Sequence, residues 1–175
     1  GDILATTGSC GDTSSAFKIL LGGAACPKKR QGELLKSVYM PRARVREGIA
    51  LADSGAATSC IDSSDGLAMS LHDLSQSSGV GFRLTSIPVT EESTKFAEYN
   101  DLDGDELALY GGEEYELIYT LSPKRMDEAR AALSNVGGEL HILGRAIRGD
   151  SITYVKDGRG IPVEMRGWEH FSAEG

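Results

Sequence analysis

The segment Ile61-Asp62-Ser63-Ser64-Asp65-Gly66-Leu67 constrains the fold most, because it joins a strand-like pattern to a helix-like one. Apolar residues dominate positions 56–61, and leucines then recur at helical spacing at 67, 71 and 74. The connection carries two carboxylates and two hydroxyl groups. Carboxylates bind hard cations such as Mg²⁺, while hydroxyls and the N–H groups of a helix start bind phosphate oxygens. The segment therefore predicts either a magnesium and phosphate site or simple capping of the helix by Asp or Ser.

Strand-like and helix-like segments alternate in the first half of the chain, and strand-like segments cluster in the second half. This order predicts an α/β (α+β) fold in which a mixed β-sheet is layered with helices. We expect strands at 3–6, 56–61, 81–87, 115–121, 140–147, 151–156 and 161–165. We expect helices at 14–21, 45–52, 67–77 and 91–98, and another from Ser122-Pro123 onward. Residues 24–40 give mixed signals, and residues 100–105 have the pattern of an acidic loop.

Composition excludes some classes of protein. The 175 residues carry a net charge of −8, with a pI of about 4.9 and no basic stripe, which argues against nucleic-acid binding. No apolar run approaches the roughly 20 residues that a membrane span needs. Cys10, Cys26 and Cys60 are few and widely spaced, so we expect reduced thiols and a cytoplasmic protein. Cys60 lies within the apolar strand and is predicted to be a core residue.

Two further segments combine glycines with candidate ligands. Gly111-Gly112-Glu113-Glu114-Tyr115 places acids after two glycines at the mouth of a strand, so that Glu113 could face a ligand. The alternative is a plain turn into an edge strand. Gly8 and Gly11 precede Thr13 at a helix start, where Asp12 or Thr13 could cap the helix. That loop could bind phosphate, although a tight strand-to-helix turn is the favoured interpretation.

Trp168 is the only tryptophan, and it lies near the end of the chain. Its indole could stack on a flat heterocycle or lie over a cation. The favoured alternative is an anchor that packs the tail on the body of the domain.

Taken together and in order, these segments resemble the C-terminal domain of the thiamine-monophosphate kinase family. That family belongs to the superfamily of aminoimidazole-ribonucleotide synthetase and selenophosphate synthetase. The resemblance covers nearly the whole chain and rests on five segments, at 1–16, 41–48, 61–67, 111–117 and 167–171. Five ordered matches are more specific than any single motif.

The resemblance implies ATP-dependent phosphorylation of thiamine monophosphate to thiamine diphosphate, with Mg²⁺ as cofactor. It implies that Asp62 and Asp65 bind Mg²⁺ and that Ser64 contacts ATP. It further implies that Glu113 and Trp168 contact the thiamine substrate. An indole and a carboxylate suit a cationic, aromatic thiazolium. No covalent nucleophile is assigned, since phosphoryl transfer depends mainly on positioning and charge neutralisation.

The resemblance also implies a larger parent enzyme. Residues 1–175 correspond to a single C-terminal domain, and the family's N-terminal domain, which carries most metal-binding aspartates and builds a homodimer, is absent. The chain also opens almost directly on a strand, which predicts a domain boundary at its start. We therefore expect this chain alone to lack kinase activity.

Two alternatives to this function stay open. One is another ATP-dependent enzyme of the same superfamily, acting on a different phosphorylated or selenium-containing substrate. The other is a non-catalytic module that binds magnesium and nucleotide. The sequence also departs from the family pattern at position 114, where Glu replaces the usual Asp.

Overall fold

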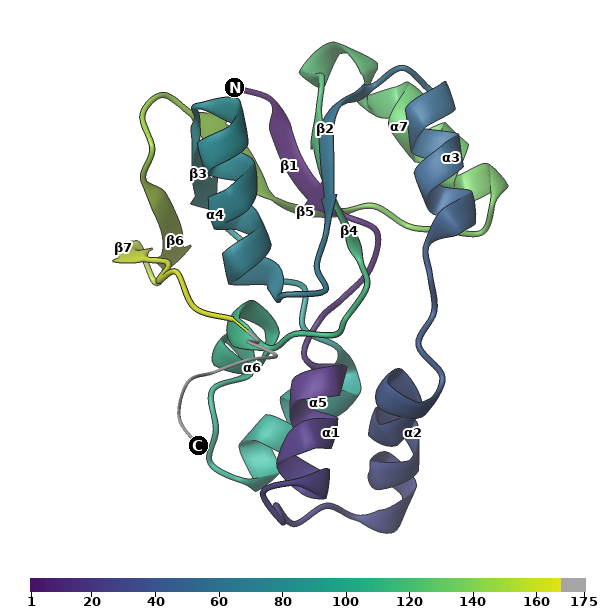
Figure 1. Cartoon of the computed structure of the whole chain (residues 1–175), viewed down its shortest axis with the longest axis vertical. Coiled ribbons are helices and arrows are strands. Elements are labelled where there is room, and N and C mark those ends of the chain that lie inside the picture. The colour runs from purple at the N-terminus through teal and green to yellow at the C-terminus, as the bar shows by residue number, and fades with distance from the viewer. Residues whose placement is uncertain (168–175) are drawn as a thin grey trace.

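The computed structural model describes residues 1–167 and contains one β-sheet and two groups of helices (Figure 1). The sheet, with α3, α4 and α7, occupies the upper part of the view, and α1, α2, α5 and α6 form the lower part. Within residues 1–167 no helix has the length and apolar character that crossing a bilayer requires.

The sheet has the strand order β2-β4-β1-β5-β3-β6-β7. Neighbouring strands are antiparallel except for β3 and β6, which are parallel. The sheet is therefore mixed, as the sequence predicts. The strands are β1 (Ile3–Thr6), β2 (Ala57–Asp62), β3 (Gly81–Leu84), β4 (Leu117–Leu121), β5 (His141–Ile147), β6 (Ile152–Lys156) and β7 (Arg159–Pro162).

Helices cover both faces of the sheet and also form the separate lower group. They are α1 (Asp12–Leu20), α2 (Lys28–Tyr39), α3 (Val45–Asp53), α4 (Leu67–Ser78), α5 (Glu91–Tyr99), α6 (Gly104–Tyr110), the short 3-10 helix η1 (Pro123–Arg125) and α7 (Met126–Asn135).

Successive side chains of the central strand β1 point to opposite faces of the sheet, and helices cover both faces. Leu4 packs into a buried cluster with Leu71 of α4 and Phe82 of β3. Ile3 and Ala5 point to the opposite face, where a second cluster includes residues of α3 and α7. The period of two in the strand therefore divides its apolar side chains between two layers of helix.

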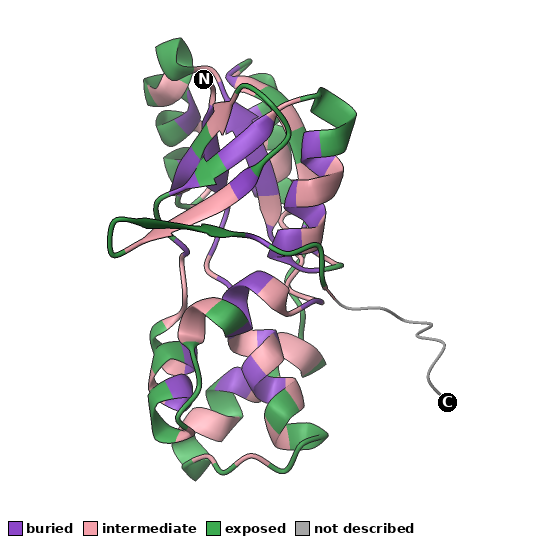
Figure 2. Ribbon diagram, turned by 90° about the vertical axis from the view of Figure 1, so that its left-hand side faces the viewer, coloured by how far each residue is buried: buried purple, intermediate pink, exposed green. Residues whose placement is uncertain are grey.

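The lower helices have a core of their own. It contains Ala16 of α1, Leu34 of α2, Phe96 of α5 and Leu107 of α6. Figure 2 shows buried residues along the strands of the sheet and on the inner sides of these lower helices. Residues 7–11, 40–44, 85–90 and 111–116 join the two parts.

Several elements differ from the sequence prediction. Residues 28–39 form α2. The acidic loop expected at residues 100–105 covers residues 100–103, and its last two residues begin the helix α6, which runs to Tyr110. Asp103 explains the start of α6, because its carboxylate accepts from the backbone N–H groups of Asp105 and Glu106. The prediction that Cys60 is a core residue is wrong, because Cys60 is exposed. Its strand, β2, lies at the edge of the sheet, and within residues 1–167 it pairs with β4 alone.

Candidate functional site

The turn between β2 and α4 is joined to the segment that leads into β4. Ser63 is buried between them, and its backbone N–H donates to the Glu116 carbonyl at 2.9 Å. The Glu116 N–H donates in return to Ser63 Oγ at 3.0 Å. Two motifs that lie about fifty residues apart in the sequence therefore form one continuous surface. We call residues 62–66 the first turn and residues 111–116 the second turn.

A close backbone approach fixes glycine at the end of the first turn. Gly66 has a φ of 101°, and a Cβ atom there would lie 2.6 Å from the Gly111 carbonyl oxygen. Any other residue would combine left-handed strain with a collision against backbone. This contact and the Ser63 bonds hold the two turns together.

The predicted ligand residues of the first turn lie at the surface. Asp62 and Asp65 are exposed and Ser64 is partly exposed, directly before the N-terminus of α4. Carboxylate oxygens at this place suit Mg²⁺ in chemical type. Among residues 1–167 no group of three or more acidic, histidine or cysteine side chains could enclose a metal ion. The donors present therefore fit one side of a magnesium site.

The second turn brings the predicted substrate residue beside the first. Glu113 N–H donates to the Ser64 carbonyl at 2.7 Å. The Tyr115 hydroxyl donates to the Glu113 carboxylate, which is the main cause of a raised pKa for Tyr115, with burial and the charges of Glu113 and Asp62 adding to it. The charges of Asp62 and Glu113 both raise the pKa of the Tyr115 hydroxyl. The two carboxylates therefore lie near the same side chain, on one side of the molecule.

The second turn also holds an unusual backbone conformation. Glu113 and Tyr115 have φ values of 66° and 55°, in the left-handed region that residues with a Cβ rarely adopt. This explains why β4 begins at Leu117 rather than at Tyr115, where the sequence predicted it to start. Such residues persist only where surrounding contacts hold them, and they cluster at functional sites.

Glu114 occupies the N-terminus of α1. That helix begins at Asp12 with no side-chain cap of its own, so the predicted capping by Asp12 or Thr13 is wrong. Instead Glu114 Oε1 accepts from the backbone N–H groups of Gly11 at 2.6 Å and Thr13 at 3.3 Å. The possible phosphate loop at residues 8–11 is therefore a strand-to-helix turn whose donors already serve a carboxylate.

The environment of Glu114 disfavours its charge. Burial raises the pKa of its carboxyl group to about 7, and the nearby charge of Asp12 adds to this effect. The N–H groups of Gly11 and Thr13 act in the opposite direction but do not cancel it.

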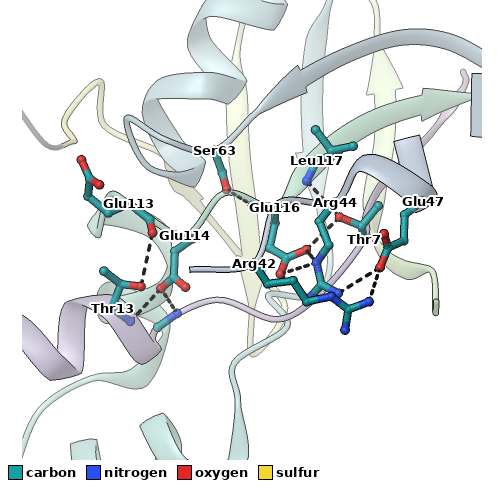
Figure 3. A network of polar contacts seen from close by, with 11 residues as sticks. Thr7, Thr13, Arg42, Arg44, Glu47, Ser63, Glu113, Glu114, Glu116 and Leu117 are labelled. Atoms are coloured by element: carbon teal, nitrogen blue, oxygen red, sulfur yellow. Dashed lines mark hydrogen bonds and ion pairs between the residues drawn. The ribbon is translucent and has the colours of Figure 1, made fainter. Parts of the chain in front are cut away.

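A buried ion-pair network supports the second turn from behind (Figure 3). Arg44 Nε donates to both carboxylate oxygens of Glu116, at 2.9 and 2.8 Å, and Arg44 Nη1 reaches Glu47 at 3.2 Å. The Thr7 hydroxyl donates to Glu116 at 2.8 Å and accepts from the Leu117 N–H at 2.9 Å. The network links the α2–α3 connection, the end of β1 and the start of β4.

The sequence predicts the Ser63 hydroxyl as one of two candidate phosphate ligands, but Ser63 is buried and its hydroxyl accepts from the Glu116 N–H group. No role was predicted for Arg44 or Glu116. Arg44 could have been found, since it belongs to the segment 41–48 on which the family resemblance rests. The pairing of Ser63 with Glu116 was missed because it joins distant parts of the chain.

A cavity of about 460 Å³ opens beside Gly111 and Gly112. Phe17 and Tyr110 contribute aromatic surface to it, and the Arg166 guanidinium lies 3.7 Å from the centre of the Tyr110 ring. Gly167 then passes so close to the Asp65 carbonyl that a side chain there would collide. Trp168 lies outside the described residues, so its predicted contact with a substrate stays a prediction.

Comparison with known proteins gives consistent matches. A family model described as AIR synthase related protein, C-terminal domain, matches residues 1–157. The thiamine-monophosphate kinase of Pyrococcus horikoshii is 34% identical over 172 residues, which cover 97% of this chain and 50% of that protein. The thiamine-monophosphate kinase of Nitrosopumilus maritimus is 29% identical over 170 residues, with 97% and 53% covered. The chain spans about half the length of the curated relatives it matches.

A solved structure, AaThiL complexed with AMPPCP and TMP, has the same fold. It matches with a TM-score of 0.80 at 27% identity, covering 98% of this chain and 52% of that one. These matches confirm the family resemblance and the mixed-sheet fold that the sequence predicts.

The Arg44 network generates a stability prediction. Replacing Arg44 with Met removes the guanidinium from two carboxylates whose side chains are only 7% (Glu116) and 2% (Glu47) exposed. We expect the free energy of unfolding in urea to fall by about 3–5 kcal/mol, because the buried Glu116 carboxylate loses its arginine partner, while Glu47 keeps its ion pair with Arg42 at 2.8 Å. The matched change Arg130→Met, at an exposed position of α7, should alter it by no more than about 0.5 kcal/mol. A loss below about 1 kcal/mol at Arg44 would contradict the account of this network.

The raised pKa of Glu114 generates a pH prediction. A carboxyl group that binds its proton more tightly in the folded state stabilises the protein below its ordinary pKa, and that contribution is lost as the pH rises through the folded-state value. A rise from 4.5 to about 7 corresponds to up to about 3 kcal/mol. We therefore expect wild type to lose stability relative to Glu114→Gln between pH 4.5 and 7, as measured by urea unfolding at several pH values. Parallel pH profiles for the two proteins would show the assignment to be wrong.

Proposed function

The chain belongs to the family of AIR synthase related proteins through their C-terminal domain, and from that premise we propose that it is part of a thiamine-monophosphate kinase. The enzyme transfers the γ-phosphoryl group of ATP to a terminal phosphate oxygen of thiamine monophosphate. A new P–O bond forms, the bond to the β-phosphate oxygen breaks, and ADP leaves with thiamine diphosphate as the other product. The AaThiL complex with AMPPCP, an analogue of ATP, and TMP supports this pair of substrates.

One observation carries the proposal. The Glu113 N–H donates to the Ser64 carbonyl at 2.7 Å, which sets the second turn directly beside the first. Phosphoryl transfer requires the two substrates to meet in line, so groups that hold each of them must lie side by side. In this proposal Ser64 contacts ATP, and Glu113 faces the thiamine substrate together with Trp168.

Asp62 and Asp65 are the residues that would hold Mg²⁺ at this surface. Bound there, the ion would neutralise negative charge on the phosphate groups. The two aspartates frame the start of α4, whose N–H groups favour anions and so add to the attraction for phosphate.

The proposal also concerns the rest of the protein. Since the described residues offer only part of a metal cage, the other ligands come from a second domain N-terminal to this one. We propose that the two domains together form a homodimeric enzyme and that this chain alone is inactive. The three cysteines are free thiols, which supports a cytoplasmic location.

The proposal is tested by removing each carboxylate in turn. In the protein that carries both domains, Asp62→Asn and Asp65→Asn should each weaken binding of AMPPCP with Mg²⁺ by about tenfold or more, measured by titration calorimetry. Turnover of thiamine monophosphate should fall in parallel. Asp150→Asn, an exposed aspartate in the β5–β6 connection, serves as the control and should bind like wild type.

Three results would contradict the proposal. Unchanged magnesium-dependent binding in both variants would remove Asp62 and Asp65 from the site. Turnover of an aminoimidazole precursor in place of thiamine monophosphate would assign the protein to another enzyme of the superfamily, and nucleotide binding without turnover would leave a binding module.

A further inference from the structure

Glu114 joins the second turn to a helix of the lower part of the molecule. Its carboxylate accepts from the N–H groups of Gly11 and Thr13, at 2.6 and 3.3 Å. The Thr13 hydroxyl lies 3.5 Å from the Glu113 carbonyl oxygen, to which it donates. The start of α1 therefore holds two successive residues of the second turn, at positions 113 and 114.

The backbone of the second turn requires such support. Glu113 has a φ of 66°, in the left-handed region where a non-glycine residue is strained and persists only because surrounding contacts hold it. One side of the turn is held by the bond from Glu113 N–H to the Ser64 carbonyl, and the other side by α1. Figure 3 shows that the Glu113 side chain points away from that of Glu114, so one faces outward while the other reaches α1.

We propose that Glu114 is a positioning residue that caps α1 and thereby holds Glu113 in its left-handed conformation beside the first turn. Glu114 itself makes no contact with substrate in this proposal. What the turn binds rests on the proposed function, whereas the effect of Glu114 on the conformation of Glu113 does not.

The groups that face Glu114 disfavour its charge, so the N–H groups at the start of α1 are what stabilise its carboxylate. Asp12 from α1 and Glu116 from the second turn are acidic, Cys10 is a buried thiol, and Arg44 is engaged by Glu116. No cap from α1 itself competes for the N–H groups of Gly11 and Thr13. A cavity of about 300 Å³ borders Glu114, so solvent protons can reach it.

Amide hydrogen exchange measured by NMR on this chain tests the proposal without any assay of activity. The Gly11 and Thr13 amides report the cap, and the Glu113 amide, which bonds to Ser64, reports the turn. In Glu114→Ala we expect all three to exchange about fivefold faster, the effect of losing a helix cap, while the amides of the central strand β1 report global unfolding and are used to correct for it. Glu114→Gln keeps an acceptor oxygen, so it should fold in any case and show a smaller increase at the same amides. Glu128→Gln, on the exposed side of α7, should change none of them.

The outcomes separate a positioning role from a merely local one. If Gly11 and Thr13 exchange faster while Glu113 exchanges as in wild type, Glu114 is only a helix cap and the proposal is wrong. Unchanged exchange at all three amides in both variants would also overturn it. Because exchange is measured without substrate, failure of the proposed kinase activity would leave this result intact.

Discussion

The buried Glu116 carboxylate is the constraint on which the candidate site depends. Its side chain is held by the fork of Arg44 and by the Thr7 hydroxyl, while its backbone exchanges two hydrogen bonds with Ser63. One residue therefore connects the end of β1, the α2–α3 connection, the first turn and the start of β4. A charge placed there requires its partners, because an unpaired buried carboxylate would be strongly destabilising. The fold and the alignment of the two turns are consequently fixed by the same interaction.

Asp62 ends the edge strand β2, where it pairs with Leu117, and Ser64 and Asp65 follow in the turn before α4. Glu113 faces outward from a strained turn whose other acid, Glu114, reaches inward to α1. The three acids of the second turn, Glu113, Glu114 and Glu116, thus have different roles: facing the surface, capping a helix and pairing with Arg44. The three glutamates look alike in the sequence, but the structure places each in a different environment.

The sequence allowed the strand-turn-helix unit, the mixed sheet and the helices α3, α4, α5 and α7 to be predicted, because their periodicity and capping signals are local. It did not allow α2 to be assigned, since a helix with many charges and only Leu34 fully buried has a weak pattern. Cys60 was wrongly predicted to be buried, because the sequence of an apolar strand does not show whether the strand lies in the centre or at the edge of a sheet. The roles of Ser63, Glu114 and Glu116 depend on contacts between residues 50 to 110 positions apart, and no local pattern encodes them.

The central claim is that the first and second turns form one surface, with the magnesium nucleotide at the first turn and thiamine monophosphate at the second. It is tested most directly by recording the amide spectrum of the isotope-labelled protein that carries both domains while AMPPCP with Mg²⁺, and then thiamine monophosphate, are added. The account predicts shifts at residues 62–66 with the nucleotide and at residues 111–115 with thiamine monophosphate. Shifts centred on another surface such as α7, or no shifts at millimolar ligand, would contradict it.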